Sequence, residues 1–135
     1  METVISITLW NVILLGALLS LQPFVRVLNS GLKYALSSFD QRIAEGVFAR
    51  RLAMVRTNQS EALMLWVPVV VTAAAVAPEF AHPHLPLIAT VFLIARFAYA
   101  AVSLAGVPML RSGAWIVGFA AWAYLTWIVM YAIAS

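Results

Sequence analysis

The fold class follows from one stretch of the chain, MVRTNQSEALMLWVPVVVTAAAVAP, at residues 54–78. Its apolar part, Ala62–Ala77, would span only about 24 Å as a helix, whereas the hydrocarbon core of a bilayer is about 30 Å thick. To cross a membrane, the helix must therefore extend backwards through Glu61 and Asn58. We predict a membrane-spanning helix over residues 47–77 that carries a carboxylate and a carboxamide near one membrane boundary.

The composition of the chain supports a membrane environment. The 135 residues are 64% hydrophobic and only 10% charged, which is far more apolar surface than a soluble domain of this size can bury. The length predicts one domain, residues 1–135. The net charge is +3, but the basic residues lie between apolar segments, which favours a role in membrane topology over nucleic-acid binding. Since cysteine is absent, the protein has no disulfide, thiolate metal site or redox pair of its own.

Three further apolar stretches have the length of spanning helices, at residues 3–25, 85–107 and 113–134. The first has no positively charged region before it, so we interpret it as a retained helix and not as a signal peptide. Its Asn11 and Gln22 are expected to hydrogen-bond across helices. With the helix described above, these stretches predict an all-α integral membrane protein, a bundle of four transmembrane helices.

The basic residues predict the orientation of the bundle. Arg111 lies between the third and fourth spans, and Glu79 and two histidines lie between the second and third. The connection between the first and second spans holds most of the cations, namely Arg26, Lys33, Arg42, Arg50, Arg51 and Arg56. The positive-inside rule then places both basic connections in the cytoplasm and both termini on the non-cytoplasmic side.

Two ionisable residues, Glu61 and Arg96, are expected at membrane depth, where such groups usually face a bundle interior or a wet cavity. Asn58 and Glu61 are three residues apart and share a helix face. Arg96 is expected near the middle of the membrane, with Tyr99 and Ser103 following on the same face. The rise along the two helices leaves a contact between Arg96 and Glu61 within reach, either directly or through water.

This arrangement has two interpretations. Arg96 and Glu61 form a buried ion pair that fixes helix packing, or they belong to a polar pocket open to the cytoplasm. We favour the pocket, because Asn58, Tyr99, Arg111 and the arginines of the first connection converge at the same level. Arginine binds carboxylates bidentately, and a single carboxylate among cations can hold an ammonium group. The predicted ligand is a small zwitterion with surplus carboxylates, held beside an apolar surface.

Three segments resemble the MAPEG family, the membrane-associated proteins of eicosanoid and glutathione metabolism. The segment RLAMVRTNQSE (51–61) resembles the second-helix motif of the family. The segment ARFAYAAVSLAGVPMLRSGAW (95–115) resembles the third-helix motif of its bacterial members, and GLKYALSSFD (31–40) resembles their first cytoplasmic loop. The resemblance covers nearly the whole chain. It implies a homotrimer in the bacterial inner membrane, with glutathione bound between neighbouring subunits near the cytoplasmic face.

The resemblance also implies residues and chemistry for the site. Glutathione would be the co-substrate, and its thiolate would attack a hydrophobic electrophile from the bilayer or reduce a lipid hydroperoxide; no metal is implied. Arg111 would stabilise the thiolate, and Tyr99 would donate a hydrogen bond to the sulfur. The residues expected to bind glutathione are Lys33, Arg51, Arg56, Asn58, Glu61, Arg96, Tyr99 and Ser103.

The chain departs from the family pattern at three positions. Met54 stands where active relatives often have arginine, Arg56 where they have histidine or glutamine, and Ser103 where they have a second tyrosine. Met54 and Ser103 leave open a non-catalytic glutathione-binding or structural membrane module. A third possibility is a small proton-coupled transporter that uses Glu61 as its coupling carboxylate.

Two further patterns are assigned no catalytic role. His82 and His84 flank a proline and are too few for a closed metal site, so no metal is predicted. Trp115, Phe119 and Trp122 follow one another at helical spacing. This stripe either lines an entry for a hydrophobic substrate or faces lipid and neighbouring helices.

Overall fold

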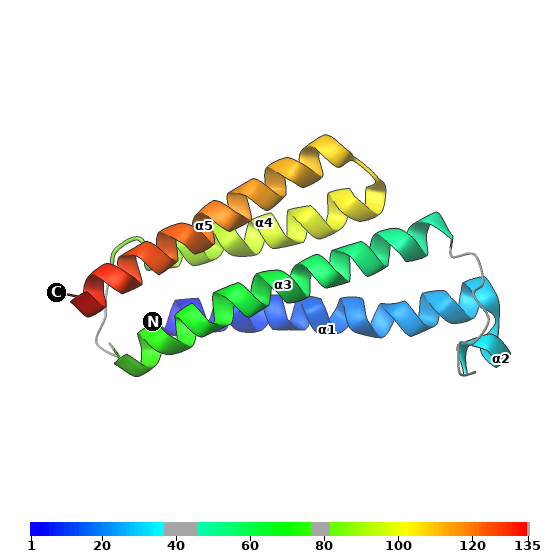
Figure 1. Ribbon diagram of the computed structural model, residues 1–135, viewed down its shortest axis with the longest axis horizontal. Helices are drawn as coiled ribbons and strands as arrows, with labels where there is room; N and C mark the ends of the chain where they lie inside the picture. Colours follow the sequence, from blue (N-terminus) through cyan, green and yellow to red (C-terminus); the bar gives the residue numbers. More distant parts are fainter. Residues whose placement is uncertain (37–45, 77–81, 135) are drawn as a thin grey trace.

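The computed structural model describes residues 1–36, 46–76 and 82–134, and within these ranges the only regular elements are helices. Four of the helices in these ranges are long and apolar enough to cross a membrane, and the fifth, α2, is short (Figure 1). The predicted all-α architecture with four spanning helices is confirmed. The elements in chain order are α1 (Glu2–Ser30), α2 (Leu32–Ala35), α3 (Val47–Val76), α4 (Leu85–Ala105) and α5 (Pro108–Ala134).

Apolar side chains cover the outside of the bundle as well as its interior. The buried share of the most apolar window is 17% in α1 and reaches 44% only in α4, the most enclosed helix. Large side chains such as Leu9, Phe24 and Met64 are more than half exposed. A soluble protein rarely exposes so much contiguous apolar surface, whereas in a bilayer the same surface contacts acyl chains. The chain is an integral membrane protein.

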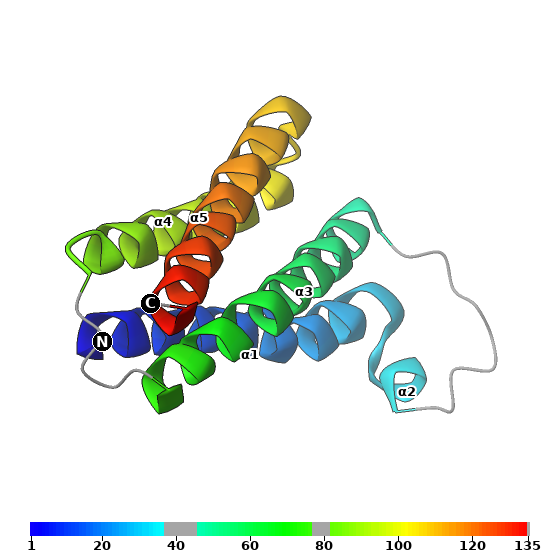
Figure 2. The same cartoon turned by 60° about the vertical axis from the view of Figure 1, so that its left-hand side comes forward.

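The four long helices form two antiparallel pairs, with α1 beside α3 and α4 beside α5 (Figures 1 and 2). One core cluster joins all four and contains Trp66, Phe92 and Leu125. A second cluster, which contains Leu52 and Tyr99, lies nearer the α4–α5 turn. Both chain termini lie at the opposite end of the bundle from that turn (Figure 1). The bundle therefore has a terminal end and an end where the basic connections gather.

The first helix is longer than predicted. The apolar pattern predicts residues 3–25, whereas α1 continues through Pro23 to Ser30. A proline inside a helix costs about 3 kcal/mol, but Val25 packs into the core just beyond it and holds the last turns in place. Several positions used in the sequence predictions lie outside the described ranges, namely residues 37–40 of the GLKYALSSFD segment, Arg42, Ala77, Pro78 and Glu79.

The turn between α4 and α5 is tighter than predicted. The sequence predicts spans 85–107 and 113–134 with Arg111 between them, whereas α5 begins at Pro108. Gly106 adopts the left-handed conformation, with φ 84°, and ends α4. Proline is favoured in the first turn of a helix because its fixed φ suits the helix and its missing N–H is not needed there. Arg111 is thus a helical residue in the first turns of α5.

Gly106→Ala is expected to destabilise the protein by about 1–2 kcal/mol. The left-handed conformation costs a non-glycine residue about 1–2 kcal/mol. An added Cβ would also displace the guanidinium group of Arg51, which can move because it is the end of a flexible side chain. A thermal melt in detergent should show a lower midpoint. Gly16→Ala is the control, since nothing lies within 4 Å of its Cβ position, and an equal loss in both variants would contradict the prediction.

Candidate functional site

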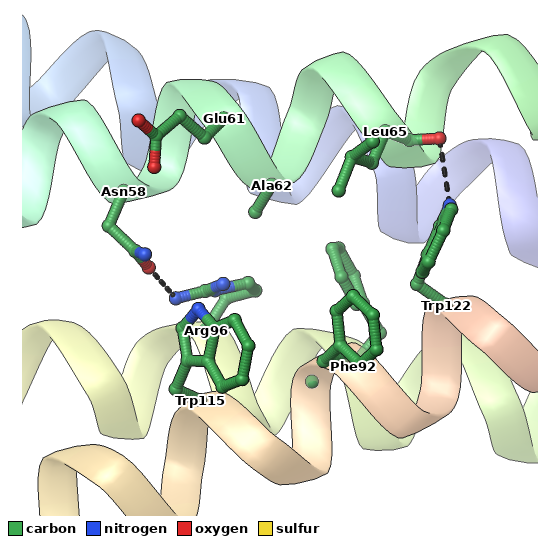
Figure 3. Close-up of a pocket in the computed structure, with 10 residues that line it drawn as sticks. Asn58, Glu61, Ala62, Leu65, Phe92, Arg96, Trp115 and Trp122 are labelled. Atoms are coloured by element: carbon green, nitrogen blue, oxygen red, sulfur yellow. Dashed lines mark hydrogen bonds between the residues drawn. The ribbon is translucent and has the colours of Figure 1, made fainter.

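A pocket of about 120 Å³ lies between α3, α4 and α5 (Figure 3). Helices α3 and α4 supply its polar end, and the aromatic side chains of α5 supply much of its apolar wall. The lining residues are Asn58, Glu61, Ala62, Leu65, Phe92, Arg96, Trp115, Gly118, Phe119 and Trp122. Three of the predicted site residues, Asn58, Glu61 and Arg96, are therefore brought together in one cavity.

Arg96 is the central polar residue of this pocket. It is only 3% exposed, and its Nη2 donates a hydrogen bond of 2.6 Å to Oδ1 of Asn58 (Figure 3). Its Cζ lies 4.8 Å from the centroid of the Tyr99 ring, in cation–π contact. Its buried Nε has no hydrogen-bond partner among the described residues. A buried charge that meets only neutral partners is costly, so the pocket favours an anion.

Arg96 and Glu61 line the same pocket, but among the described residues the structure shows no ion pair or hydrogen bond between them. The direct form of the predicted contact is therefore not made, and a contact through water stays a prediction. The Arg96 guanidinium donates a hydrogen bond to Asn58, whereas Glu61 is exposed and its carboxylate is not bonded to Arg96 (Figure 3). The side chain of Asn58, which is shorter than that of Glu61, points toward α4 and occupies the position next to Arg96. The interpretation of Arg96 and Glu61 as a buried packing pair has no support in this geometry.

The other predicted arginines contact uncharged groups outside the pocket. Arg51 Nη1 donates a hydrogen bond of 3.2 Å to the backbone oxygen of Leu104, near the C-terminal end of α4. Arg111 Nη1 lies 3.4 Å from the thioether sulfur of Met54. Arg56 is directed to α1, where its Nη1 donates to the side chain of Gln22. Arg51 and Arg111 lie near the α4–α5 turn, whereas Arg56 faces the first helix.

The remaining predicted residues occupy different surroundings. Tyr99 and Ser103 follow Arg96 along the buried face of α4, as predicted. The hydroxyl of Ser103 is buried and has no hydrogen-bond partner among the described residues. Lys33 is exposed on the short helix α2 and does not line the pocket. Lys33 is separate from the Arg96 pocket.

The apolar wall is the part of the pocket that the sequence indicated only as an alternative. Trp115 and Phe119 stack with ring centroids 5.3 Å apart, and Phe119 lies 5.1 Å from Trp122. Trp122 Nε1 donates a hydrogen bond of 3.0 Å to the backbone oxygen of Leu65, which ties α5 to α3. Trp115 is 43% and Phe119 44% exposed, so the wall reaches the outer surface of the bundle. Sequence reasoning missed Leu65 and Phe92, whose only signal is helical spacing.

The two histidines lie far from this pocket, near the terminal end of the bundle. Nδ1 of His84 is 2.8 Å from the hydroxyl of Tyr124, and the backbone N–H of His84 donates to Nδ1 of His82. Within residues 1–36, 46–76 and 82–134, no group of three or more metal-binding side chains is found. The histidine pair joins the start of α4 to α5.

The fold and the pocket define a class of protein, a small four-helix membrane protein with a buried cation at the end of a cavity that opens at the outer surface of the bundle. Within that class, the chain belongs to the MAPEG family, whose model matches residues 7–131. No curated protein and no solved structure matches the chain. Family membership identifies the chain as a membrane protein of the glutathione-transferase and eicosanoid type in general, as the resemblance of its motifs predicted.

Proposed function

We propose that the protein is a membrane-bound glutathione transferase and peroxidase that binds glutathione at its cytoplasmic side. The observation that carries this proposal is Arg96, a guanidinium that is 3% exposed, contacts only neutral groups and has an unpaired Nε. An anionic ligand would stabilise such a buried, uncompensated positive charge. Glutathione carries two carboxylates, one ammonium group and a thiol, and a carboxylate is the natural bidentate partner of arginine.

The polar end of the pocket suits the two ends of this peptide. Arg96 and Asn58 would bind a carboxylate, with Asn58 turning its amide N–H toward the ligand. Glu61, exposed one turn away, would accept the ligand ammonium. Ligand sites usually measure about 300–1,000 Å³, so a pocket of about 120 Å³ holds only part of glutathione. We infer that a neighbouring subunit of a homotrimer completes the site and that Lys33 reaches it from that neighbour.

The proposed chemistry is activation of the glutathione thiol. A free thiol titrates near pH 8.5, and a nearby cation lowers that pKa because it stabilises the thiolate. Arg111 is the proposed cation, and Tyr99 the proposed hydroxyl donor. Arg111 already contacts a sulfur atom, that of Met54. Arg51, Arg56 and Ser103 would act around the site as supporting cations and a hydroxyl group.

Two reactions follow from the thiolate. In conjugation, its sulfur attacks an electrophilic carbon, a C–S bond forms, and a leaving group departs or a proton is taken up. In hydroperoxide reduction, two glutathione molecules and one hydroperoxide give an alcohol, water and glutathione disulfide. The apolar substrate would enter along the aromatic wall formed by Trp115, Phe119 and Trp122.

The proposed location is the bacterial inner membrane, with the site facing the cytoplasm. Within the described residues, the basic side chains Arg26, Lys33, Arg50 and Arg111 belong to the end of the bundle away from the termini. The positive-inside rule places this end in the cytoplasm. Glutathione is a cytoplasmic peptide, whereas hydrophobic electrophiles dissolve in the bilayer, so the site would lie where the two substrates meet.

The test is glutathione binding by the purified protein in detergent, measured by calorimetry, followed by product formation with an aromatic halide and an organic hydroperoxide. Saturable binding with turnover supports the proposal. Binding without turnover would identify the non-catalytic module, which the contact of Arg111 with Met54 favours. A well-folded protein that shows no binding at millimolar glutathione would refute the proposal.

Met54→Leu is expected to raise kcat/KM for glutathione about two- to fivefold. The thioether accepts a hydrogen bond from Arg111, and the thiolate must compete for that donor. Exchanges between methionine and leucine conserve volume, so the melting midpoint should stay nearly constant. Met64→Leu, which changes an exposed residue of the same helix, serves as the control. A lower kcat/KM in the Met54 variant would mean that the thioether assists the reaction.

A further inference from the structure

Helix α1 lines no part of the pocket, yet it is hydrogen-bonded to α3 at three successive levels. Near the termini, Trp66 Nε1 donates to Thr8 Oγ1 at 2.8 Å. Further along, Gln59 Nε2 donates to the backbone oxygen of Asn11 at 3.2 Å and lies 3.4 Å from its Oδ1. At the basic end, Arg56 Nη1 donates to Gln22 Oε1. These contacts confirm the predicted interhelical role of Asn11 and Gln22.

The middle contact is the most enclosed. Asn11 is 0% and Gln59 2% exposed, so neither side chain has water as an alternative partner. An unmade hydrogen bond there would leave a buried polar group unsatisfied, at a cost of about 1–3 kcal/mol. The contact therefore favours one rotation of α3 about its axis and one axial position against α1.

That rotation decides where Asn58 points. Successive residues of an α-helix are separated by about 100° around its axis. With Gln59 held toward α1, the preceding residue, Asn58, faces α4 and meets Arg96 at 2.6 Å. A turn of α3 that broke the Gln59–Asn11 contact would also move Asn58 away from Arg96. The polar end of the pocket thus depends on a contact made on the opposite side of α3.

A second connection runs from α1 to the apolar end of the pocket. Trp66 is fully buried, and its ring stacks on Phe92 with centroids 3.9 Å apart and planes inclined by 10°. Phe92 lines the pocket, whereas Trp66 and Thr8 do not. The hydrogen bond from Trp66 to Thr8 therefore fixes a ring that supports the pocket wall from behind.

We propose that Gln59 and Trp66 are positioning residues through which α1 sets the two ends of the site. Gln59 aligns Asn58 and Arg96 for glutathione, and Trp66 aligns Phe92 for the apolar substrate. This inference rests on the proposed function only for the identity of the two ligands. Because each residue acts on one substrate, changes at Gln59 should affect the Kd for glutathione and changes at Trp66 should affect the KM for the electrophile. A general loss of stability would affect both.

The first test removes the Gln59–Asn11 contact without leaving a buried polar group unpaired. In the double variant Asn11→Leu/Gln59→Leu both partners are apolar, an exchange that can be nearly neutral for stability. We expect a melting midpoint close to wild type, a Kd for glutathione raised about tenfold, and a KM for the electrophile within twofold. Gln59→Met, which keeps the side-chain length, is the second variant if the double variant folds poorly.

Ser60→Ala is the matched control, because among the described residues Ser60 Oγ donates its hydrogen bond to the backbone oxygen of Arg56 in the same helix. It removes a hydroxyl group from the same helical turn without touching α1, and its glutathione Kd should equal that of wild type. A similar loss of affinity in this variant would overturn the specific role of Gln59.

The second test removes the hydrogen bond of Trp66 and keeps the stacked ring. Trp66→Phe and Thr8→Val should each raise the KM for the electrophile about three- to tenfold and leave the glutathione Kd unchanged. If loss of one contact weakens only glutathione binding and loss of the other weakens only use of the electrophile, the two contacts align separate parts of the site. If all variants lower both affinities in parallel with the melting midpoint, the contacts are purely structural and the inference fails.

A third readout is independent of glutathione. Because the chain has no cysteine, Ala62→Cys introduces a single thiol on the pocket face of α3. Its labelling rate with a small thiol reagent should change severalfold when Asn11→Leu/Gln59→Leu is added and stay constant with Ser60→Ala. Failure of wild-type glutathione binding would then refute the proposed function alone. Unchanged labelling in a stable double variant would refute the positioning role.

Discussion

Arg96→Ala is expected to lower the affinity for glutathione at least a hundredfold. The side chain is buried, and a ligand carboxylate would receive two charge-assisted hydrogen bonds from it, each contributing about 1.5–3 kcal/mol. Since 1.4 kcal/mol corresponds to a factor of ten in Kd, the loss of both bonds exceeds two orders of magnitude. Calorimetry on the detergent-solubilised variant measures the change directly.

The controls separate charge from packing. Arg96→Met preserves much of the volume and should lose as much affinity as Arg96→Ala, whereas Arg96→Lys should retain part of it because the charge remains. Arg50→Ala removes an exposed cation of the same region and should leave the Kd within a factor of two. Near-normal glutathione affinity in a folded Arg96→Met protein would exclude Arg96 from the binding site.

Arg111→Ala is expected to lower kcat about 10²–10³-fold, the range observed when one fixed donor to a developing anion is removed. The cation favours the thiolate over the thiol, so its removal raises the pKa of bound glutathione toward about 8.5. The rising limb of the profile of kcat against pH should move to higher pH, and the deficit should shrink there. The ultraviolet absorbance of the thiolate, titrated in the bound state, provides the same pKa without turnover.

Two variants make this result specific. Arg111→Lys should keep much of the pKa shift and lose less activity than Arg111→Ala. Ser112→Ala removes the neighbouring hydroxyl, which bonds to the backbone oxygen of Pro108, and should behave as wild type. If kcat falls while the pH profile stays in place, Arg111 supports the fold of the α4–α5 turn, and another group activates the thiol.

The membrane topology could be predicted because it depends on length and hydrophobicity. The comparison of Ala62–Ala77 with the bilayer thickness correctly extended the helix through Glu61 and Asn58. The positions at which the helices begin and end were predicted less well from the sequence. The continuation of α1 past Pro23 depends on tertiary packing of the residues beyond it, and the early start of α5 depends on the conformation of Gly106.

The sequence predicted that Arg96 faces the interior of the bundle, but not which residue it contacts. Arg96 is buried among the helices as expected, yet its partner is Asn58 and not Glu61. The choice between two residues on one face depends on the rotation of α3 by a few tens of degrees, which sequence spacing does not specify. Arg51 and Arg56 were grouped with the site by level, whereas the structure pairs them with Leu104 and Gln22. Side-chain direction, set by local acceptors, decides such cases.

Under the proposed function, a hydrophobic substrate reaches the exposed rings of Trp115 and Phe119 from the bilayer, so the concentration that matters is the one in the lipid phase. A hydrophobic compound that arrives through the acyl chains is present at a level set by its partition coefficient and by the volume of the lipid phase. Two preparations with the same total compound but different amounts of lipid would therefore offer the protein different substrate densities. Affinities for such compounds are properly expressed as mole fractions in the bilayer, and adding empty vesicles would act as a dilution.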